Sequence, residues 1–355
     1  MNPFTFGSSF QVKVLGSSHG PFVGVEVRGV PAGLEVSEEE IQRELDKRKP
    51  GQNSLTTQRR EEDRLVVLSG LNDGRTTGGV LRMKIENKDV RMKDYSQFAS
   101  IPRPGHADMT SVEKFGKTFP GGGVFSGRMT AAFVMAGAVA KALIRRQGIR
   151  VNAHLCQAGK VRIRRQVSDK ELAEVPWSND VHTAAAESAG ELAAEIDGAR
   201  RDGDSVGGLV ECRIRGLKPG LGDPMFGSIE SRISAAAFAI PAVKGIEFGS
   251  GFEGATWRGS RNNDAFALEG GKVVTKTNNC GGILGGLATG MPIVFRAAFK
   301  PTSSIAREQK TLDLATGRKA RLRIAGRHDP CIAIRAVPVV EAIAAMVIAD
   351  IVSSR

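Results

Sequence analysis

The segment MTAAFVMAGAVAKALIRR, residues 129–146, is apolar on almost every side of the helix that its composition predicts. A second segment with the same property, VVEAIAAMVIADIV, lies at residues 339–352. A surface helix of a soluble protein has one apolar face, whereas a helix that is apolar all round is buried on all sides. We therefore expect these two helices inside a layered structure rather than on its surface.

Short segments with the alternation or β-branched content of strands surround these helices. They are VKVLG (12–16), FVGVEVRGV (22–30), RLVVLSG (64–70), GGLVECRIRGL (207–217) and MPIVFRAAF (291–299). SEEEIQRELDKR (37–48) predicts an amphipathic helix with Ser37 as its N-cap, and AAESAGELAAEIDGA (185–199) predicts another helix. Because short turns separate strand pairs, we expect an α+β sandwich of antiparallel sheets with the buried helices between them. No linker or repeat divides residues 1–355, which favours a single domain.

The cysteine spacing and the distribution of apolar residues indicate the compartment in which the protein resides. The four cysteines are scattered and form no CxxC pair, which favours reduced thiols. No run of about 18 or more apolar residues is present, and the start MNPFTFGSSF lacks the features of a signal peptide. We expect a cytoplasmic protein that does not span a membrane.

The formal net charge of +12 indicates an anionic partner, either nucleic acid or a small molecule. Nucleic-acid binders usually cluster basic residues on one element and add aromatics for stacking. Here aromatic residues make up only 5% and the basic residues are dispersed, so DNA binding that depends on salt would have to be shown. Several arginines lie in glycine-rich loops instead, which favours a polyanionic small molecule.

Two glycine- or hydroxyl-rich segments could bind that anion. GGVFSGRM (122–129) has the glycine spacing of a P-loop, but Arg128 and Met129 replace the Lys and Ser or Thr that a nucleotide triphosphatase needs. It remains either an anion-binding helix start or a tight turn. KPTSSI (300–305) joins a lysine to three hydroxyls, and is either a phosphate-binding turn or a solvated one.

Three of the five histidines lie in loops, namely His19 in GSSHG, His106 in RPGHAD and His328 in GRHDPC. Loop histidines beside glycines are open to a ligand, although a single one is often incidental. A zinc site is not expected, because HExxH and CxxC pairs are absent. His154 and His182 receive no role.

Eight motifs occur in the order found in chorismate synthases, and the matching text covers residues 10–350: GSSHG, RPGHAD, GGGVFSGR, DGDSVGG, KGIEFGSGF, NNCGGILGG, KPTSSI and GRHDPC. The chain thus resembles the chorismate synthase family. The resemblance implies the 1,4-elimination of phosphate from 5-enolpyruvylshikimate 3-phosphate to give chorismate, the last common step of the shikimate pathway. It also implies reduced FMN as cofactor and a homotetramer. Two alternatives stay open: a divergent FMN-binding paralogue that acts on another phosphorylated cyclic acid, and a catalytically silent binding protein.

The resemblance also implies roles for particular residues. His19 would protonate the departing phosphate, His106 would face the reduced flavin ring, and Asp329 would lie next to flavin N5. His328 is only a possible support. The substrate would be held by four arginines, Arg48, Arg103, Arg128 and Arg327, with Arg59 and Arg60 as weaker candidates. FMN would contact Ser126, Pro241, Ala242, Gly285, Lys300, Pro301, Thr302, Ser303, Ser304 and Arg327. Whether the chain reduces its flavin with NADPH is left open, and an external flavin reductase is favoured.

The chain departs from the family pattern at five positions. Ser17 stands where the family reads glutamate, Val124 and Phe125 where it reads arginine and serine, and Met129 where it reads glutamate. Ser54 stands where an arginine or lysine is common. Either paired charges were exchanged together for apolar packing, which can be neutral, or the flavin loop has changed and activity is weakened or redirected. We favour the first, because the residues expected to be catalytic remain.

Overall fold

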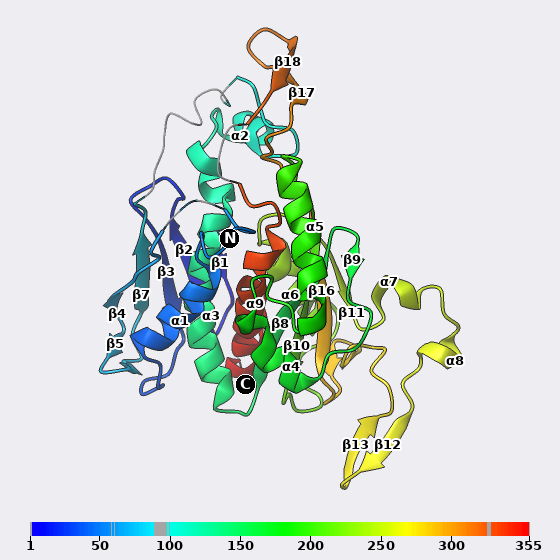
Figure 1. Cartoon of the computed structure of the whole chain (residues 1–355). Coiled ribbons are helices and arrows are strands. Elements are labelled where there is room, and N and C mark those ends of the chain that lie inside the picture. The colour runs from blue at the N-terminus through cyan, green and yellow to red at the C-terminus, as the bar shows by residue number, and fades with distance from the viewer. Residues whose placement is uncertain are drawn as a thin grey trace.

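Two antiparallel sheets of five strands each face one another across a layer of helices (Figure 1). This computed structural model describes residues 2–57, 59, 61–88, 98, 100–324 and 328–354. The first sheet has the order β1-β2-β3-β7-β4, with bounds Thr5–Phe6, Gln11–Gly16, Phe22–Arg28, Leu81–Glu86 and Leu65–Ser69. The second has the order β11-β16-β10-β8-β9, with bounds Val243–Phe248, Ile293–Phe299, Gly208–Arg215, Arg150–Ala158 and Val161–Arg162. The predicted α+β sandwich is confirmed.

The helix layer is built around α3 (Thr130–Arg145) and α9 (Ala333–Ser353). α3 packs on β3 of the first sheet, and α9 packs on β8 and β10 of the second. The two helices cross closely at Gly137, where a Cβ atom would lie 2.4 Å from the Cβ atom of Ala342. α1 (Glu38–Arg48) and α6 (Ile229–Phe238) pack beside α9 and complete the layer. The burial expected for the two apolar helices is therefore confirmed.

Strand β10 shows how the sheets present their apolar faces to this layer. Val210, Cys212 and Ile214 are fully buried, whereas Glu211 and Arg213 between them are only partly buried. Successive side chains of a strand point to opposite faces, so β10 packs one face on α9. One continuous hydrophobic cluster joins such residues from both sheets with the helices between them.

Helix α9 begins six residues earlier than its apolar pattern predicts, and it contains Pro338. A proline within a helix has no N–H to donate to the carbonyl four residues before it. That carbonyl, on Ile334, lies 3.1 Å from Nδ1 of the buried His182, which can donate in its place. Burial lowers the pKa of His182, so the ring is neutral at pH 7. His182 therefore has a structural role that the sequence did not suggest.

The other predicted segments are confirmed as elements, and Ser37 caps α1 by accepting a hydrogen bond from the N–H of Glu40 at 3.2 Å. Strands β7, β8 and β11 were not predicted. β8 carries His154. The His154 side chain is buried, whereas a polar residue on a surface strand would be exposed. The remaining elements are peripheral: α2 (Asp108–Phe115), α4 (Asp169–Glu174), α5 (Ala189–Arg201), α7 (Gly251–Gly254), α8 (Gly259–Asn262) and the strand pairs β5–β6 (Leu71–Asn72, Arg75–Thr76), β12–β13 (Phe266–Glu269, Lys272–Thr275), β14–β15 (Ile283–Leu284, Leu287–Ala288) and β17–β18 (Gln309–Asp313, Arg318–Leu322).

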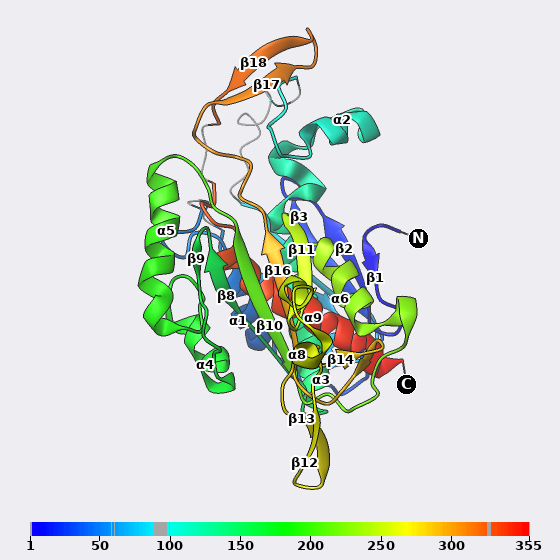
Figure 2. The same ribbon diagram turned by 90° about the vertical axis from the view of Figure 1, so that its right-hand side faces the viewer.

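Two helical segments are long and apolar enough to cross a membrane by length and composition alone. They are Gly127–Arg145 and Ala333–Ser353, and 83% and 89% of their apolar windows are buried inside the protein. Their apolar surface is thus used in the core. Two hairpins, β12–β13 and β17–β18, project from opposite ends of the molecule (Figure 2).

Candidate functional site

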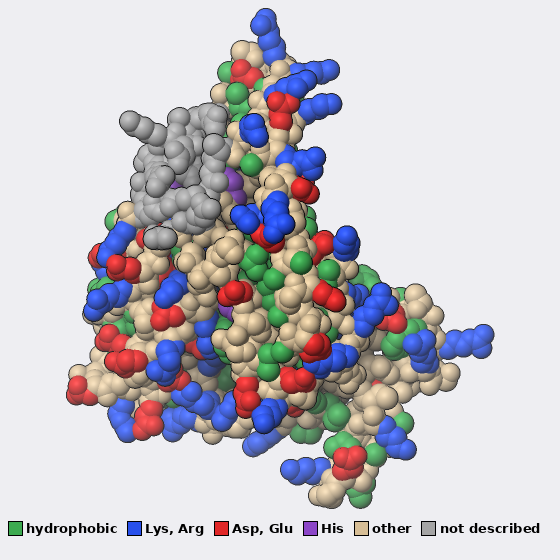
Figure 3. All heavy atoms as spheres, viewed as in Figure 1, with side chains coloured by type: hydrophobic (Ala, Val, Ile, Leu, Met, Phe, Trp, Pro, Cys, Tyr) green, Lys and Arg blue, Asp and Glu red, His purple; other side chains and the backbone are tan. Residues whose placement is uncertain are grey.

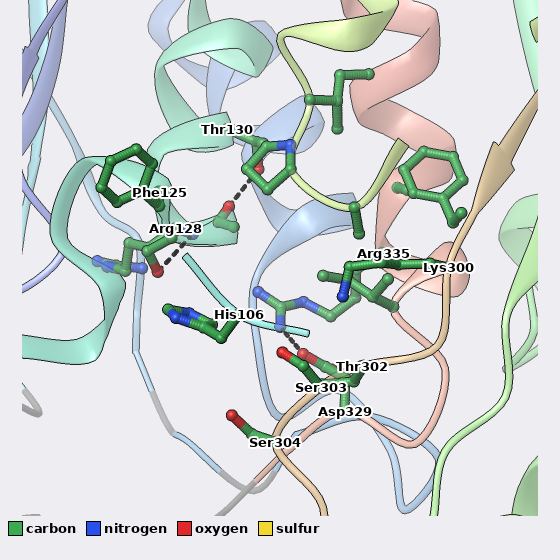
Figure 4. Close-up of a pocket in the computed structure, with 18 of the residues that line it drawn as sticks. His106, Phe125, Arg128, Thr130, Lys300, Thr302, Ser303, Ser304, Asp329 and Arg335 are labelled. Carbon is green, nitrogen blue, oxygen red and sulfur yellow. Dashed lines mark hydrogen bonds and ion pairs between the residues drawn. The ribbon is translucent and has the colours of Figure 1, made fainter. Parts of the chain in front are cut away.

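A cavity of about 690 Å³ lies where the start of α9 meets the loops around it (Figure 4). Its walls are the end of α1, the loop before α2, the glycine loop before α3, the turn between α6 and β11, and the segment after β16. Most of the residues expected to bind substrate or FMN line it: Arg48, Arg59, Arg103, His106, Ser126, Arg128, Pro241, Ala242, Lys300, Thr302, Ser303, Ser304 and Asp329. Segments far apart in sequence thus meet at one place.

Three described residues that were expected in the site, Pro301, Gly285 and His19, do not line the cavity. Pro301 is exposed beside it, and Gly285 is exposed in the β14–β15 turn. His19 lies behind the glycine loop, because a Cβ atom on the cavity residue Gly121 would lie 1.8 Å from the imidazole Cε1. Arg327 is outside the described residues, as is the weaker candidate Arg60.

Asp63 connects two of the arginines. One carboxylate oxygen accepts from Nη2 of Arg48 at 2.6 Å, and the other accepts from Nη1 of Arg128. All three side chains are buried. Burial alone would raise the pKa of Asp63, but Arg48 and Arg128 lower it below its ordinary value. The shared carboxylate fixes both guanidinium groups at the cavity wall and offsets part of their charge.

His106, Arg103 and Asp108 form a second buried cluster. Arg103 donates from Nε to Oδ2 of Asp108 and from Nη2 to Oδ1, both at 2.7 Å. Nδ1 of His106 lies 2.7 Å from the same Oδ1. Burial alone would raise the pKa of Asp108, but hydrogen bonds from Arg103 and His106 hold it well below its usual range. Asp108 is therefore ionised and touches both groups.

Asp329 is fixed by two donors. Its Oδ1 accepts from the backbone N–H of Thr57 at 2.8 Å, and its Oδ2 accepts from Nη1 of Arg335 at 2.7 Å. Arg335 also donates from Nε to the backbone oxygen of Arg48 at 3.2 Å. Arg335 lines the cavity but was not predicted as a site residue. Arg335 thus connects the Asp329 carboxylate to the backbone of Arg48 on the cavity wall.

The KPTSSI turn presents several polar groups to the cavity. Lys300 donates its backbone N–H to Ala242 at 2.9 Å, which brings the two expected FMN-binding segments together. Burial, and secondarily Lys244, lowers the pKa of the Lys300 ammonium. The hydroxyl of Thr302 is buried without a hydrogen-bond partner among the described residues. Ala242 has φ of 74°, a region that alanine rarely adopts and that is often found at functional sites.

His328 also lines the cavity. Its Nε2 atom is buried and has no hydrogen-bond partner in the described part of the chain. Burial, reinforced by the charge of Arg103, lowers its pKa to about 4. His328 is therefore neutral at pH 7, and it can exchange a hydrogen bond with a ligand without adding charge.

The glycine loop brings backbone close to two histidines. Gly121 and Gly122 have φ of 59° and 81°, which favour glycine. A Cβ atom on Gly122 would lie 3.4 Å from Nε2 of His106, and one on Gly121 would overlap His19. After the loop, Ser126 accepts from the N–H of Arg128 at 3.3 Å and starts the turn that leads into α3. Larger residues here would fill the space beside both imidazoles.

Three of the departures from the family pattern have apolar surroundings. Met129 is buried in the main hydrophobic cluster. Phe125 and Val124 line the cavity, and the Phe125 ring packs near two other phenylalanines with centroids 6.3 and 6.1 Å away. Ser17 accepts from the N–H of Gly20 at 3.0 Å, and Ser54 is exposed away from the cavity. The burial of Met129 favours exchange of a charge for apolar packing at that position.

Comparison with known proteins identifies the family. The chorismate synthase family model matches residues 10–352. A chorismate synthase of Methanocella arvoryzae is 48% identical over 98% of this chain and 93% of the relative, and one of Thermococcus kodakarensis is 48% identical over 97% and 96%. The chain belongs to the chorismate synthase family. A crystal structure of a chorismate synthase matches with a TM-score of 0.75 at 28% identity, over 98% of this chain and 92% of the other.

All described segments of the cavity wall lie within the part of the chain that matches the chorismate synthase family. Sequence reasoning missed Asp63, Asp108 and Arg335, and nothing in the local sequence of Asp63 or Arg335 marks them as buried or ligand-facing. Asp108 had the clearest signal, since it stands two residues after His106 within the family motif RPGHAD. Chorismate synthase is a carbon–oxygen lyase, so the cavity is the candidate active site of a lyase.

Proposed function

We propose that this cavity carries out the chorismate synthase reaction. It would eliminate phosphate and a C6 hydrogen from 5-enolpyruvylshikimate 3-phosphate, with reduced FMN bound beside the substrate. One observation supports this above all: arginines from separate segments line a single cavity, and buried carboxylates hold them in place. Fixed guanidinium groups suit a ligand with several acidic groups, because each can donate two parallel hydrogen bonds.

The charge of the substrate fits this wall. The substrate carries two carboxylates and a phosphate. We propose that these groups are bound by Arg48, Arg59, Arg103 and Arg128, and that Arg327 also binds the substrate. Lys and Arg side chains also crowd the β17–β18 hairpin (Figure 3). This hairpin borders the site, since Thr311 donates to the backbone oxygen of Pro102 at 2.7 Å. A positive rim of this kind attracts anions toward a cavity.

FMN fits the KPTSSI turn. The hydroxyl of Thr302, which has no partner among the described residues, and the partly buried ammonium of Lys300 are donors that a phosphate or an anionic flavin ring would satisfy. Ser126, Pro241, Ala242, Ser303 and Ser304 would border the same ligand. When bound, reduced FMN supplies an electron-rich ring that can donate transiently, so the reaction needs no net redox change. Pro301, Gly285 and Arg327 remain proposed contacts that the described cavity wall does not include.

We assign the proton-handling roles to three residues. His106 would exchange a proton or hydrogen bond with the flavin through its cavity-facing edge. Asp329, held as an acceptor by Thr57 and Arg335, would assist removal of the C6 hydrogen. His19 would protonate the leaving phosphate, which requires that the ligand reach past the glycine loop at Gly121. General acid and base groups of this kind contribute about 10²–10⁴-fold to rate.

We also propose one domain of 355 residues that assembles as a homotetramer in the cytoplasm. The shared core of both sheets supports the single domain. The projecting β12–β13 hairpin supports assembly, because its Phe266, Leu268 and Val273 side chains are 64–73% exposed. An isolated two-stranded hairpin is marginally stable in water. An external flavin reductase would supply the reduced FMN.

Equilibrium titration tests the proposal and separates it from its alternatives. Oxidised FMN should bind the purified protein, and the substrate should tighten that binding. Chorismate formed from the substrate with photoreduced FMN supports the proposal. Binding of both ligands without turnover would instead indicate a silent binding protein, and turnover only with another phosphorylated cyclic acid would indicate a paralogue.

A further inference from the structure

We infer that Asp108 is a positioning residue that fixes the tautomer of His106. It would keep the proton on Nδ1, so that Nε2 is the atom that exchanges a proton with the cavity ligand. The exchange of a proton between Nε2 and the cavity ligand rests on the proposed function, whereas the position of the proton on Nδ1 does not.

The contacts between the two side chains are short and buried. Nδ1 of His106 lies 2.7 Å from Oδ1 of Asp108, and the Asp108 side chain is only 3% exposed. The backbone N–H of Arg103 and both of its guanidinium donors to Oδ2 and Oδ1 hold the carboxylate in one orientation. The carboxylate that faces the imidazole therefore cannot turn away without breaking three hydrogen bonds.

Arg103 offers a competing arrangement, because its Nη2 lies 3.1 Å from the same Nδ1. If Arg103 donated to Nδ1, the imidazole nitrogen would be an acceptor, and its lone pair would face a carboxylate oxygen at 2.7 Å. Two acceptors at that distance repel one another, and Asp108 is ionised. Arg103 Nη2 already donates to Oδ1 at 2.7 Å, the shorter of its two contacts. With a proton on Nδ1, His106 and Arg103 can both donate hydrogen bonds to the carboxylate of Asp108.

This tautomer has a consequence for the cavity. With the proton on Nδ1, the lone pair of neutral His106 is on Nε2, the atom beside Gly122. The ring lies among the cavity residues in Figure 4. His106 can then accept a proton at Nε2 as a neutral ring or donate one from Nε2 as an imidazolium. Loss of the orienting carboxylate would let the ring turn over or change tautomer, as occurs in other carboxylate–histidine pairs.

Ring-nitrogen NMR of protein labelled with ¹⁵N-histidine tests the inference directly. The His106 signals are assigned by their loss in His106→Gln. In the wild-type protein at neutral pH, without ligand, Nδ1 of His106 should be protonated. In Asp108→Asn the proton should move wholly or partly to Nε2, because the neutral amide no longer favours a donor at Nδ1. In Asp46→Asn, a control that neutralises a partly exposed aspartate outside the cavity wall, Nδ1 should stay protonated.

A wild-type His106 with its proton on Nε2 overturns the inference, as does an Asp108→Asn variant with an unchanged tautomer. The wild-type measurement decides even if the variant does not fold. Activity gives a separate reading: kcat of Asp108→Asn should fall about 10-fold or more, while kcat of the control Asp46→Asn should stay at the wild-type value. A protein that makes no chorismate would refute the proposed function and leave the tautomer result intact.

Discussion

Replacement of Asp63 by asparagine would test the carboxylate that holds Arg48 and Arg128. Asparagine tolerates positive φ about as well as aspartate, and Asp63 has φ of 49°, so the change isolates the charge. Removal of one partner from a buried ion pair costs about 3–5 kcal/mol. Because the amide oxygen can still accept from one guanidinium group, we expect a loss near the lower limit, about 3 kcal/mol. The substrate KM should rise as well, since at least one of the two arginines loses the carboxylate that positions it.

Equilibrium unfolding in urea at pH 7 measures the loss, with Asp46→Asn as the control. Asp46 accepts from Lys49 at 3.1 Å, and both side chains are about 40% exposed, so its loss should cost at most about 1 kcal/mol. The pKa of Asp63 is lowered on folding, so its contribution is present above the unfolded value of 3.8 and lost as pH falls through the folded value. Equal free energies of unfolding for Asp63→Asn and Asp46→Asn at pH 7 would contradict a stabilising role for the buried Asp63 carboxylate.

Three further predictions concern the cavity. His106→Ala should lower kcat by about two orders of magnitude at an unchanged urea midpoint, and turnover like that of the wild type would contradict its role. Thr302→Val should raise the FMN dissociation constant about tenfold, because it removes an unpartnered donor, and an unchanged constant in a fluorescence titration would remove Thr302 from the cofactor site. Arg335→Gln should lower kcat about tenfold through a misplaced Asp329, and a steady-state assay with unchanged kcat would exclude that link.

The sandwich could be predicted because the two central helices have no polar face, which leaves burial as the only stable arrangement. Strand pairing could not be predicted in the same way. β3 pairs with β7, and β10 pairs with β16, across long intervening segments, and local periodicity carries no information on such partners. The first turns of α9 were missed because Pro338 is normally a helix breaker. His182, distant in sequence, supplies the donor that the proline lacks.

The cations of the site were predicted from family motifs, but the groups that fix them were not. Asp63 lies in a run of charged residues, and only the folded chain shows that Glu61 and Asp63 are buried whereas Glu62 is exposed. Arg335 lies in the part of α9 that was not predicted as helix. The position of His19 behind Gly121 depends on the path of the glycine loop, which sequence spacing does not define.

The central claim is that this arginine-lined cavity converts the substrate with reduced flavin. Its most direct test is the yield of chorismate and phosphate from purified protein, 5-enolpyruvylshikimate 3-phosphate and photoreduced FMN without oxygen. We expect both products in equal amounts over many turnovers, with no net consumption of the reduced flavin. Protein that binds both ligands but forms neither product would contradict it.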